Sequence, residues 1–177
     1  MPFIPPYPVR CVTRAEDTPA AVDAGGRVLI AQLAFPASFA GVRDALAALM
    51  AGPVLADVPD DGRAMAELVL AEALNNIVEH AYAGTCCGEI TLTLWQSEGE
   101  VACRITDRGH AMPDEVLPAG VLKDHAESAE LPEGGFGWFL IRTLSRDLRY
   151  ARLGTLNELT FVLGGEQSRT QDHSVSA

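Results

Sequence analysis

The chain contains 177 residues, with 13 Lys and Arg side chains against 24 Asp and Glu, which gives a formal net charge of −11. This length predicts one domain with a substantial core, and a hydrophobic content of 48% excludes an intrinsically disordered chain. The negative charge argues against direct binding to nucleic acid, which needs a basic surface, and against adhesion to anionic membranes. No apolar run approaches the roughly 18–20 residues that span a bilayer.

The two ends of the chain differ in composition from its centre. Residues 1–27 lack periodicity and are expected to form an extended N-terminal segment, and residues 165–177 are expected to form a flexible tail. The proline-rich start has no apolar segment of the kind found in signal peptides. The four cysteines show no C-x-x-C spacing, so we expect reduced thiols in a cytoplasmic protein.

The region 28–164 contains both helix and strand patterns. In chain order we expect a strand at 28–35, a helix capped by Ser38, a long helix from Asp60 or Asp61 to about Tyr82, strands at 89–95 and 101–106, a helix from Phe136 to about Ser145, and strands at 148–153 and 158–163. Strands cluster after helices instead of alternating with them singly. The predicted class is therefore α+β, a two-layer sandwich with a mixed, mostly antiparallel sheet covered on one face by helices.

The long predicted helix has an unusual polar face. At about 100° per residue, Glu72, Asn75, Asn76, Glu79 and His80 fall together, opposite a broad apolar arc. A solvent-exposed face would explain polarity alone, but two adjacent asparagines are poor helix formers. Glu72 and Asn76 lie one turn apart, so a carboxylate and an amide project side by side. The carboxylate can polarise a hydroxyl group or water, and the amide oxygen suits a hard cation such as Mg²⁺.

Two weaker motifs follow the second predicted hairpin strand. Asp107 and Gly109 indicate either a simple turn or a carboxylate that accepts a hydrogen bond from the exocyclic amine of a base. At residues 133–137, glycines lead directly into an apolar helix, whose N-terminal N–H groups and dipole suit a phosphate; a flexible hinge is the alternative reading. No Gly-Lys-Ser/Thr follows, so this is not a P-loop.

In this order, the three motifs resemble the GHKL-type (histidine-kinase-like, or Bergerat) ATPase fold over about residues 28–164. Residues 71–82 are most similar to the anti-sigma-factor serine/threonine kinases of the RsbW and SpoIIAB type. The resemblance implies ATP and Mg²⁺ as cofactors. It implies that Glu72 is the general base, that Asn76 binds Mg²⁺, and that the nucleotide-binding residues are Asn76, His80, Asp107, Gly109, Gly135, Phe136 and Gly137.

The same resemblance implies an ATP-dependent serine/threonine kinase that acts as an anti-sigma factor in a partner-switching system. Its substrate would be a STAS-type anti-anti-sigma protein and its other partner a sigma factor, and a homodimer is left open. One alternative is a non-catalytic nucleotide-binding module that sequesters a regulatory protein. Another is an ATP hydrolase of the same fold.

Three features depart from the family pattern. His110 and Ala111 stand where a second glycine is usual, which predicts a stiffer hinge for the lid at 110–134. That lid is acidic, with Lys123 as its one Lys or Arg, so Mg²⁺ would have to neutralise most of the phosphate charge. These two departures favour the sequestering module. The third is Asn157-Glu158, at a place where the final strand often begins with Gly-Thr.

Overall fold

The computed structural model describes residues 10–13, 21–56, 58–83, 88–97, 99–120 and 136–164. In these ranges six strands form one sheet with the order β1-β2-β3-β4-β6-β5, and all its pairings are antiparallel. The strands are β1 (Arg10–Thr13), β2 (Val28–Pro36), β3 (Glu89–Ser97), β4 (Glu100–Asp107), β5 (Arg146–Leu153) and β6 (Leu156–Gly164). The helices are α1 (Phe39–Ala51), η1 (Pro53–Leu55), α2 (Asp60–Asn76), η2 (Ile77–Ala81), η3 (Pro113–Glu115) and α3 (Phe136–Leu144).

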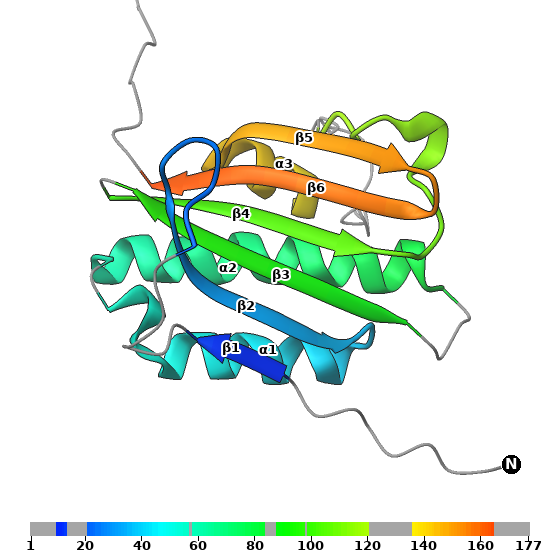
Figure 1. The fold of residues 1–177 in the computed structure, drawn as a ribbon. Coiled ribbons are helices and arrows are strands. Elements are labelled where there is room, and N and C mark those ends of the chain that lie inside the picture. Colours follow the sequence, from blue (N-terminus) through cyan, green and yellow to red (C-terminus); the bar gives the residue numbers. More distant parts are fainter. Residues whose placement is uncertain are drawn as a thin grey trace, which may run out of the picture.

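The helices cover one face of the sheet. Figure 1 views the sheet from its open side, with α1 and α2 behind the strands. The alternation along β2 explains this arrangement, because Ala31, Leu33 and Phe35 are buried against the helices while Gln32 between them is exposed. The predicted α+β class, with helices on one face of the sheet, is confirmed. The sheet was expected to be mixed, but the described strands pair only antiparallel.

Helix α1 begins where the sequence predicted. The Ser38 hydroxyl accepts a hydrogen bond from the Gly41 N–H at 3.1 Å, which satisfies one of the free donors of the first turn. The apolar face of α1 buries Val42, Ala45 and Leu49. This helix is therefore part of the core along its inner side.

The long predicted helix is confirmed, but its last turn is wider than an α-helix. Residues Asp60–Asn76 are α-helical, and Ile77–Ala81 continue as a π-helical turn. The apolar arc is buried as expected, with Ala73 and Leu74 both 0% exposed. π-Helical turns are rare and frequently occur at functional sites. In this chain the turn carries Glu79 and His80.

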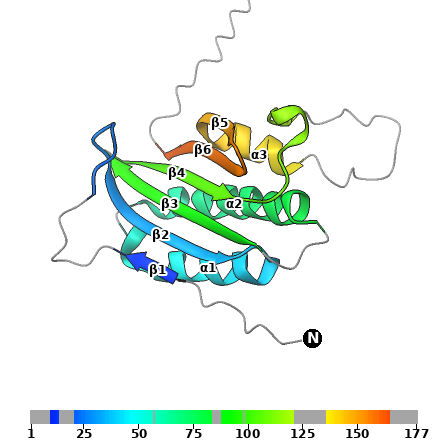
Figure 2. The ribbon, with the colours of Figure 1, turned by 45° about the vertical axis from the view of Figure 1, so that its right-hand side comes forward.

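Helix α3 lies beside α2 (Figure 2) and behind β5 and β6 in the view of Figure 1. Its buried residues are Trp138 and Ile141. The loop residues 117–120 are held against α3, since Arg142 donates hydrogen bonds to the carbonyls of Leu117 at 3.3 Å and Pro118 at 2.7 Å. None of the helices in the described ranges has the length and apolar character needed to cross a membrane.

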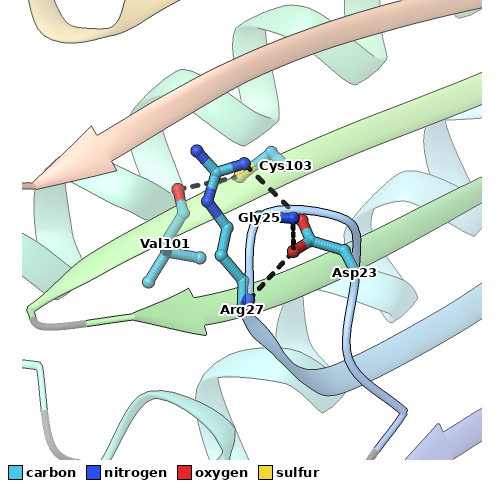
Figure 3. A network of polar contacts seen from close by, with 5 residues as sticks. All are labelled: Asp23, Gly25, Arg27, Val101 and Cys103. Carbon is cyan, nitrogen blue, oxygen red and sulfur yellow. Dashed lines mark hydrogen bonds and ion pairs between the residues drawn. The ribbon is translucent and has the colours of Figure 1, made fainter.

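The region before β2 contains a strand that the sequence did not reveal. Arg10–Thr13 pair with residues Ala31–Ala34 of β2 and extend the sheet at its edge. A compact turn leads into β2. In this turn Asp23 Oδ1 accepts hydrogen bonds from the N–H groups of Gly25 and Arg27 at 2.8 and 2.9 Å (Figure 3). The expected flexible tail, 165–177, lies outside the described residues.

Candidate functional site

A cavity of about 480 Å³ lies where η2, the end of β4 and α3 meet. Most of its wall is apolar, with Ala73, Ile77, Met112, Trp138 and Leu159 among the lining residues. The polar side chains that reach it are Asn76, Glu79, His80, Asp107, His110, Tyr150 and Asn157. An apolar cavity with a few convergent polar groups is typical of a small-molecule site, and a flat aromatic base fits such walls.

Glu72 and Asn76 lie on α2, facing the start of α3. A Cβ atom added to Gly137 would lie 2.6 Å from Glu72 Oε2 and 3.4 Å from Asn76 Nδ2. The absence of a side chain at Gly137 therefore gives both polar groups the room that they occupy. The predicted pair does not project into open solvent on the far side of the molecule, since Asn76 lines the same cavity as Asp107.

The Asn76 amide is suited to a ligand. Its Nδ2 atom is buried and has no hydrogen-bond partner within the described part of the chain. A buried polar atom without a partner costs free energy, of the order of 1–3 kcal/mol, unless a ligand or water satisfies the group. Its amide oxygen is a hard oxygen donor of the kind that Mg²⁺ prefers, and Mg²⁺ takes few ligands from the protein and keeps several waters. The donor set therefore fits Mg²⁺.

Asp107 ends β4 at the floor of the cavity and is 4% exposed. Its Oδ1 atom accepts hydrogen bonds from the Gly109 N–H at 2.7 Å and from Asn157 Nδ2 at 2.9 Å. Burial raises the pKa of this carboxyl group, and these two hydrogen bonds and the charge of Arg152 offset the effect only in part. A buried carboxylate that lines an apolar cavity can accept a hydrogen bond from a base.

Gly109 is required by a close approach to the π-helical turn. A Cβ at this position would lie 2.5 Å from the Ala81 carbonyl oxygen and 2.8 Å from Ala81 Cβ. The His110 N–H donates to the same Ala81 carbonyl at 2.9 Å, and the Arg108 N–H donates to the Tyr82 hydroxyl at 3.0 Å. Hydrogen bonds therefore hold the turn after β4 against the end of the long helix.

The predicted site residues occupy different places around this cavity. Asn76, His80 and Asp107 line it, with His80 exposed at its rim. Gly109 and Gly137 act through the close contacts described above. Phe136 is 59% exposed, and its ring is 5.9 Å from that of Phe139. Gly135 and lid residues 121–134 lie outside the described residues.

Sequence reasoning did not identify Tyr150 and Arg152 as part of the site, and it noted Asn157 only as a departure. Tyr150 lines the cavity, and its hydroxyl donates to Asn157 Oδ1 at 2.7 Å. Trp138 is 8% exposed and also lines the cavity. The polar Asn157 at the start of an otherwise apolar strand was the available signal.

An antiparallel sheet covered on one face by helices, with an apolar cavity at the end of β4, is consistent with an ATPase domain of the α+β class, and the comparison with known families identifies the family. Residues 34–163 match the histidine kinase-like ATPase domain, and the chain belongs to this family. The predicted family is therefore confirmed.

Curated relatives are serine or serine/threonine kinases by name. The serine-protein kinase RsbW of Oceanobacillus iheyensis is 29% identical over 113 residues, which cover 62% of this chain and 72% of that protein. RsbW of Listeria monocytogenes is 31% identical, with the same two coverages. The serine/threonine-protein kinase BtrW of Bordetella bronchiseptica is 37% identical over 89 residues, which cover 50% of this chain and 61% of that protein.

Proposed function

We propose that the chain is an ATP-dependent protein serine/threonine kinase with a kinase domain at residues 28–164. The observation that carries the proposal is the position of Asn76. This residue lies one helical turn from Glu72 and shares a cavity with the buried carboxylate of Asp107. In this proposal Asn76 binds the cation, Glu72 is the general base and Asp107 accepts a hydrogen bond from adenine, all around one bound nucleotide. The likeness to named serine-protein kinases supports the same activity.

In this proposal the adenine ring of ATP enters the apolar cavity, and Asp107 accepts a hydrogen bond from the exocyclic amine of that ring. The apolar side chains of Ile77, Met112 and Leu159 exclude water from the ring faces. Asn76 is the residue that would hold Mg²⁺, which offsets the negative charge of the phosphate groups when bound. Gly137, next to Glu72, belongs to the proposed phosphate side of the site. The family resemblance assigns the same role to Gly135, which lies outside the described residues.

Glu72 acts as the general base. Its carboxylate orients the hydroxyl of a serine or threonine on a docked protein and accepts the hydroxyl proton. The hydroxyl oxygen forms a bond to the γ-phosphorus as the bond between that phosphorus and the β,γ-bridging oxygen breaks, so the products are ADP and a phosphorylated side chain. Gly137 gives Glu72 the space for this position, because any larger residue would contact Glu72 Oε2.

The proposed partners rest on the likeness to RsbW-type kinases alone. The phosphorylated protein would be a STAS-type anti-anti-sigma protein, and the alternative partner would be a sigma factor. Binding one partner and releasing the other would then depend on nucleotide and on phosphorylation. A cytoplasmic location and a homodimer are parts of the same proposal.

The test is transfer of labelled phosphate from ATP to a STAS protein encoded near this gene. Wild type is expected to transfer label, and Glu72→Gln is expected to slow transfer by about 10²–10⁴-fold while it keeps nucleotide affinity. Glu67→Gln, one carboxylate earlier on α2, serves as the matched control and is expected to behave as wild type. Nucleotide binding without transfer to any tested STAS protein would favour the sequestering module, and equal rates for wild type and Glu72→Gln would reject Glu72 as the base.

A further inference from the structure

We propose that Asn157 is a positioning residue that sets the preference of the cavity for a 6-amino purine. It holds the Asp107 carboxylate through one oxygen, so that the other oxygen is presented to the base. The inference rests on the proposed nucleotide site and deepens it. It assigns a role to a residue that the family resemblance treats as a departure.

Sheet register brings the necessary residues together. Asp107 on β4 is paired with Asn157 on β6, and Asn157 is paired with Arg152 on β5. The three side chains therefore form one row across three neighbouring strands. This row lies at the ends of the strands, beside the cavity. Asp107 and Asn157 are each 4% exposed, so the interaction between them is shielded from water.

The hydrogen bonds fix which way round the Asn157 amide lies. Arg152 has only donors, and its Nη1 contacts Asn157 Oδ1. The Tyr150 hydroxyl receives the Met112 N–H at 3.1 Å, so its own proton is available for Asn157 Oδ1. Because Asn157 Oδ1 accepts from Arg152 and Tyr150, the NH₂ group of Asn157 must point at Asp107.

That NH₂ group does two things. It donates to Asp107 Oδ1 at 2.9 Å, and it contacts the carbonyl oxygens of His110 at 3.1 Å and Gly109 at 3.4 Å. The Gly109 N–H donates to the same Oδ1, so the hydrogen bonds described for this carboxylate converge on one oxygen. Oδ2 of Asp107 is then the acceptor for a ligand. The Asn157 amide also holds His110, the first residue of the lid, through its carbonyl oxygen.

The charge around Asp107 agrees with this role. Arg152 from β5 favours the ionised carboxylate, and the donor from Asn157 lowers its pKa against the opposing effect of burial. The other titratable groups that face this region are Tyr82 after η2, Tyr150 on β5, and Glu79, His80 and His110 at the cavity. Removing the Asn157 donor would leave a buried carboxylate with less support for its charge.

The first test compares ATP with inosine triphosphate, whose 6-position carries a carbonyl in place of the amine. Calorimetry on wild type is expected to give at least about 10-fold tighter binding of ATP, because a carboxylate accepts from the amine and repels the carbonyl. Asn157→Leu is expected to reduce that ratio several-fold. Glu158→Gln, the next residue on β6 and on the open face of the sheet, is the matched control and should keep the wild-type ratio.

The second test uses Asn157→Asp, which keeps the shape of the side chain, and measures ATP affinity against pH. In wild type the affinity should fall as pH is lowered through the Asp107 pKa. In Asn157→Asp two carboxyl groups face each other and share a proton, so one pKa is strongly raised. The affinity should then fall as pH is increased, because the protonated Asp replaces the amide donor.

The outcomes separate the two levels of inference. If wild type binds neither nucleotide, the proposed site fails and the role of Asn157 fails with it. If wild type prefers ATP but Asn157→Leu keeps the ratio, or Asn157→Asp keeps the wild-type direction of pH dependence, the positioning role alone is overturned. A purely structural role would weaken both nucleotides equally and would not reverse a pH profile.

Discussion

Gly109 and Gly137 both leave room for a neighbour, but different kinds of atoms occupy that room. Next to Gly137 the nearest atom is Glu72 Oε2, the end of a flexible side chain. Next to Gly109 the nearest atom is the backbone carbonyl oxygen of Ala81, which cannot move without shifting the π-helical turn. A methyl group at position 137 therefore displaces a functional group, whereas a methyl group at position 109 strains the fold.

We expect Gly137→Ala to impair catalysis without a loss of stability. Alanine is the better helix former by about 0.5–1 kcal/mol, and Glu72 can rotate away from the new methyl group. The rate of phosphate transfer should fall at least about 10-fold, since a base displaced by an ångström loses its geometry. Thr143→Ala on the exposed side of α3 is the control. Unchanged transfer by Gly137→Ala would place Glu72 outside the chemistry.

Gly109→Ala should do the opposite. The free energy of unfolding is expected to fall by about 1–3 kcal/mol, the usual cost of overpacking, because the turn after β4 must separate from Ala81. Urea denaturation measures this change. A variant as stable as wild type would show that the contact between this turn and η2 is not tight in solution.

The residues of the site differ in how visible they are in the sequence. Glu72 and Asn76 could be predicted because a helix places residues four apart on one face. Asp107 could be found because it directly follows a predicted hairpin strand and stands two residues before Gly109. Tyr150 and Arg152 could not, since they reach the site only through the register of β5 and β6, which local patterns do not encode.

At the scale of elements, most helices and strands carried clear signals, but β1 and the π-helical turn did not. The short β1 was missed because four residues are too few to show alternation and pairing with β2 is what orders them. The π-helical turn was also not predicted, because the apolar spacing of Ile77 and Val78 continues the α-helical pattern. Tertiary contacts with the turn after β4 lie at this position.

The N-terminal cap of α1 provides a prediction that is independent of the site. Ser38→Ala removes the acceptor for the Gly41 N–H and should lower the free energy of unfolding by about 0.5–2 kcal/mol. Ser38→Asp keeps an acceptor at the same position and should restore most of the loss. Nucleotide affinity should be unchanged in both variants. Equal losses for Ala and Asp would mean that the hydroxyl stabilises the helix in another way.

For the whole molecule, the buried carboxyl group of Asp107 links stability to pH. Burial raises its folded-state pKa above the ordinary value of ~3.9. Between these two pKa values the folded state binds more protons than the unfolded state. The contribution of Asp107 to the free energy of unfolding is therefore greatest at low pH, and it falls as pH increases through the folded-state pKa.

Asp107→Asn removes this titration and keeps the acceptor for Gly109 and Asn157. We expect the stability of the variant, relative to wild type, to increase as pH rises from acidic to neutral, measured by urea denaturation. Comparing the two proteins at each pH cancels the repulsion among the other charges of a chain with net charge −11. A difference that is independent of pH would show that Asp107 titrates normally in the folded protein.

The most direct measurement is calorimetric titration with Mg·ATP of wild type, Asn76→Ala and Asp107→Asn. These two substitutions lie on separate elements, α2 and β4, and meet only in the cavity. We expect wild type to bind, and each variant to lose at least about 10-fold in affinity, which corresponds to one lost charge-assisted contact. Equal affinity for all three proteins would contradict a nucleotide in this cavity.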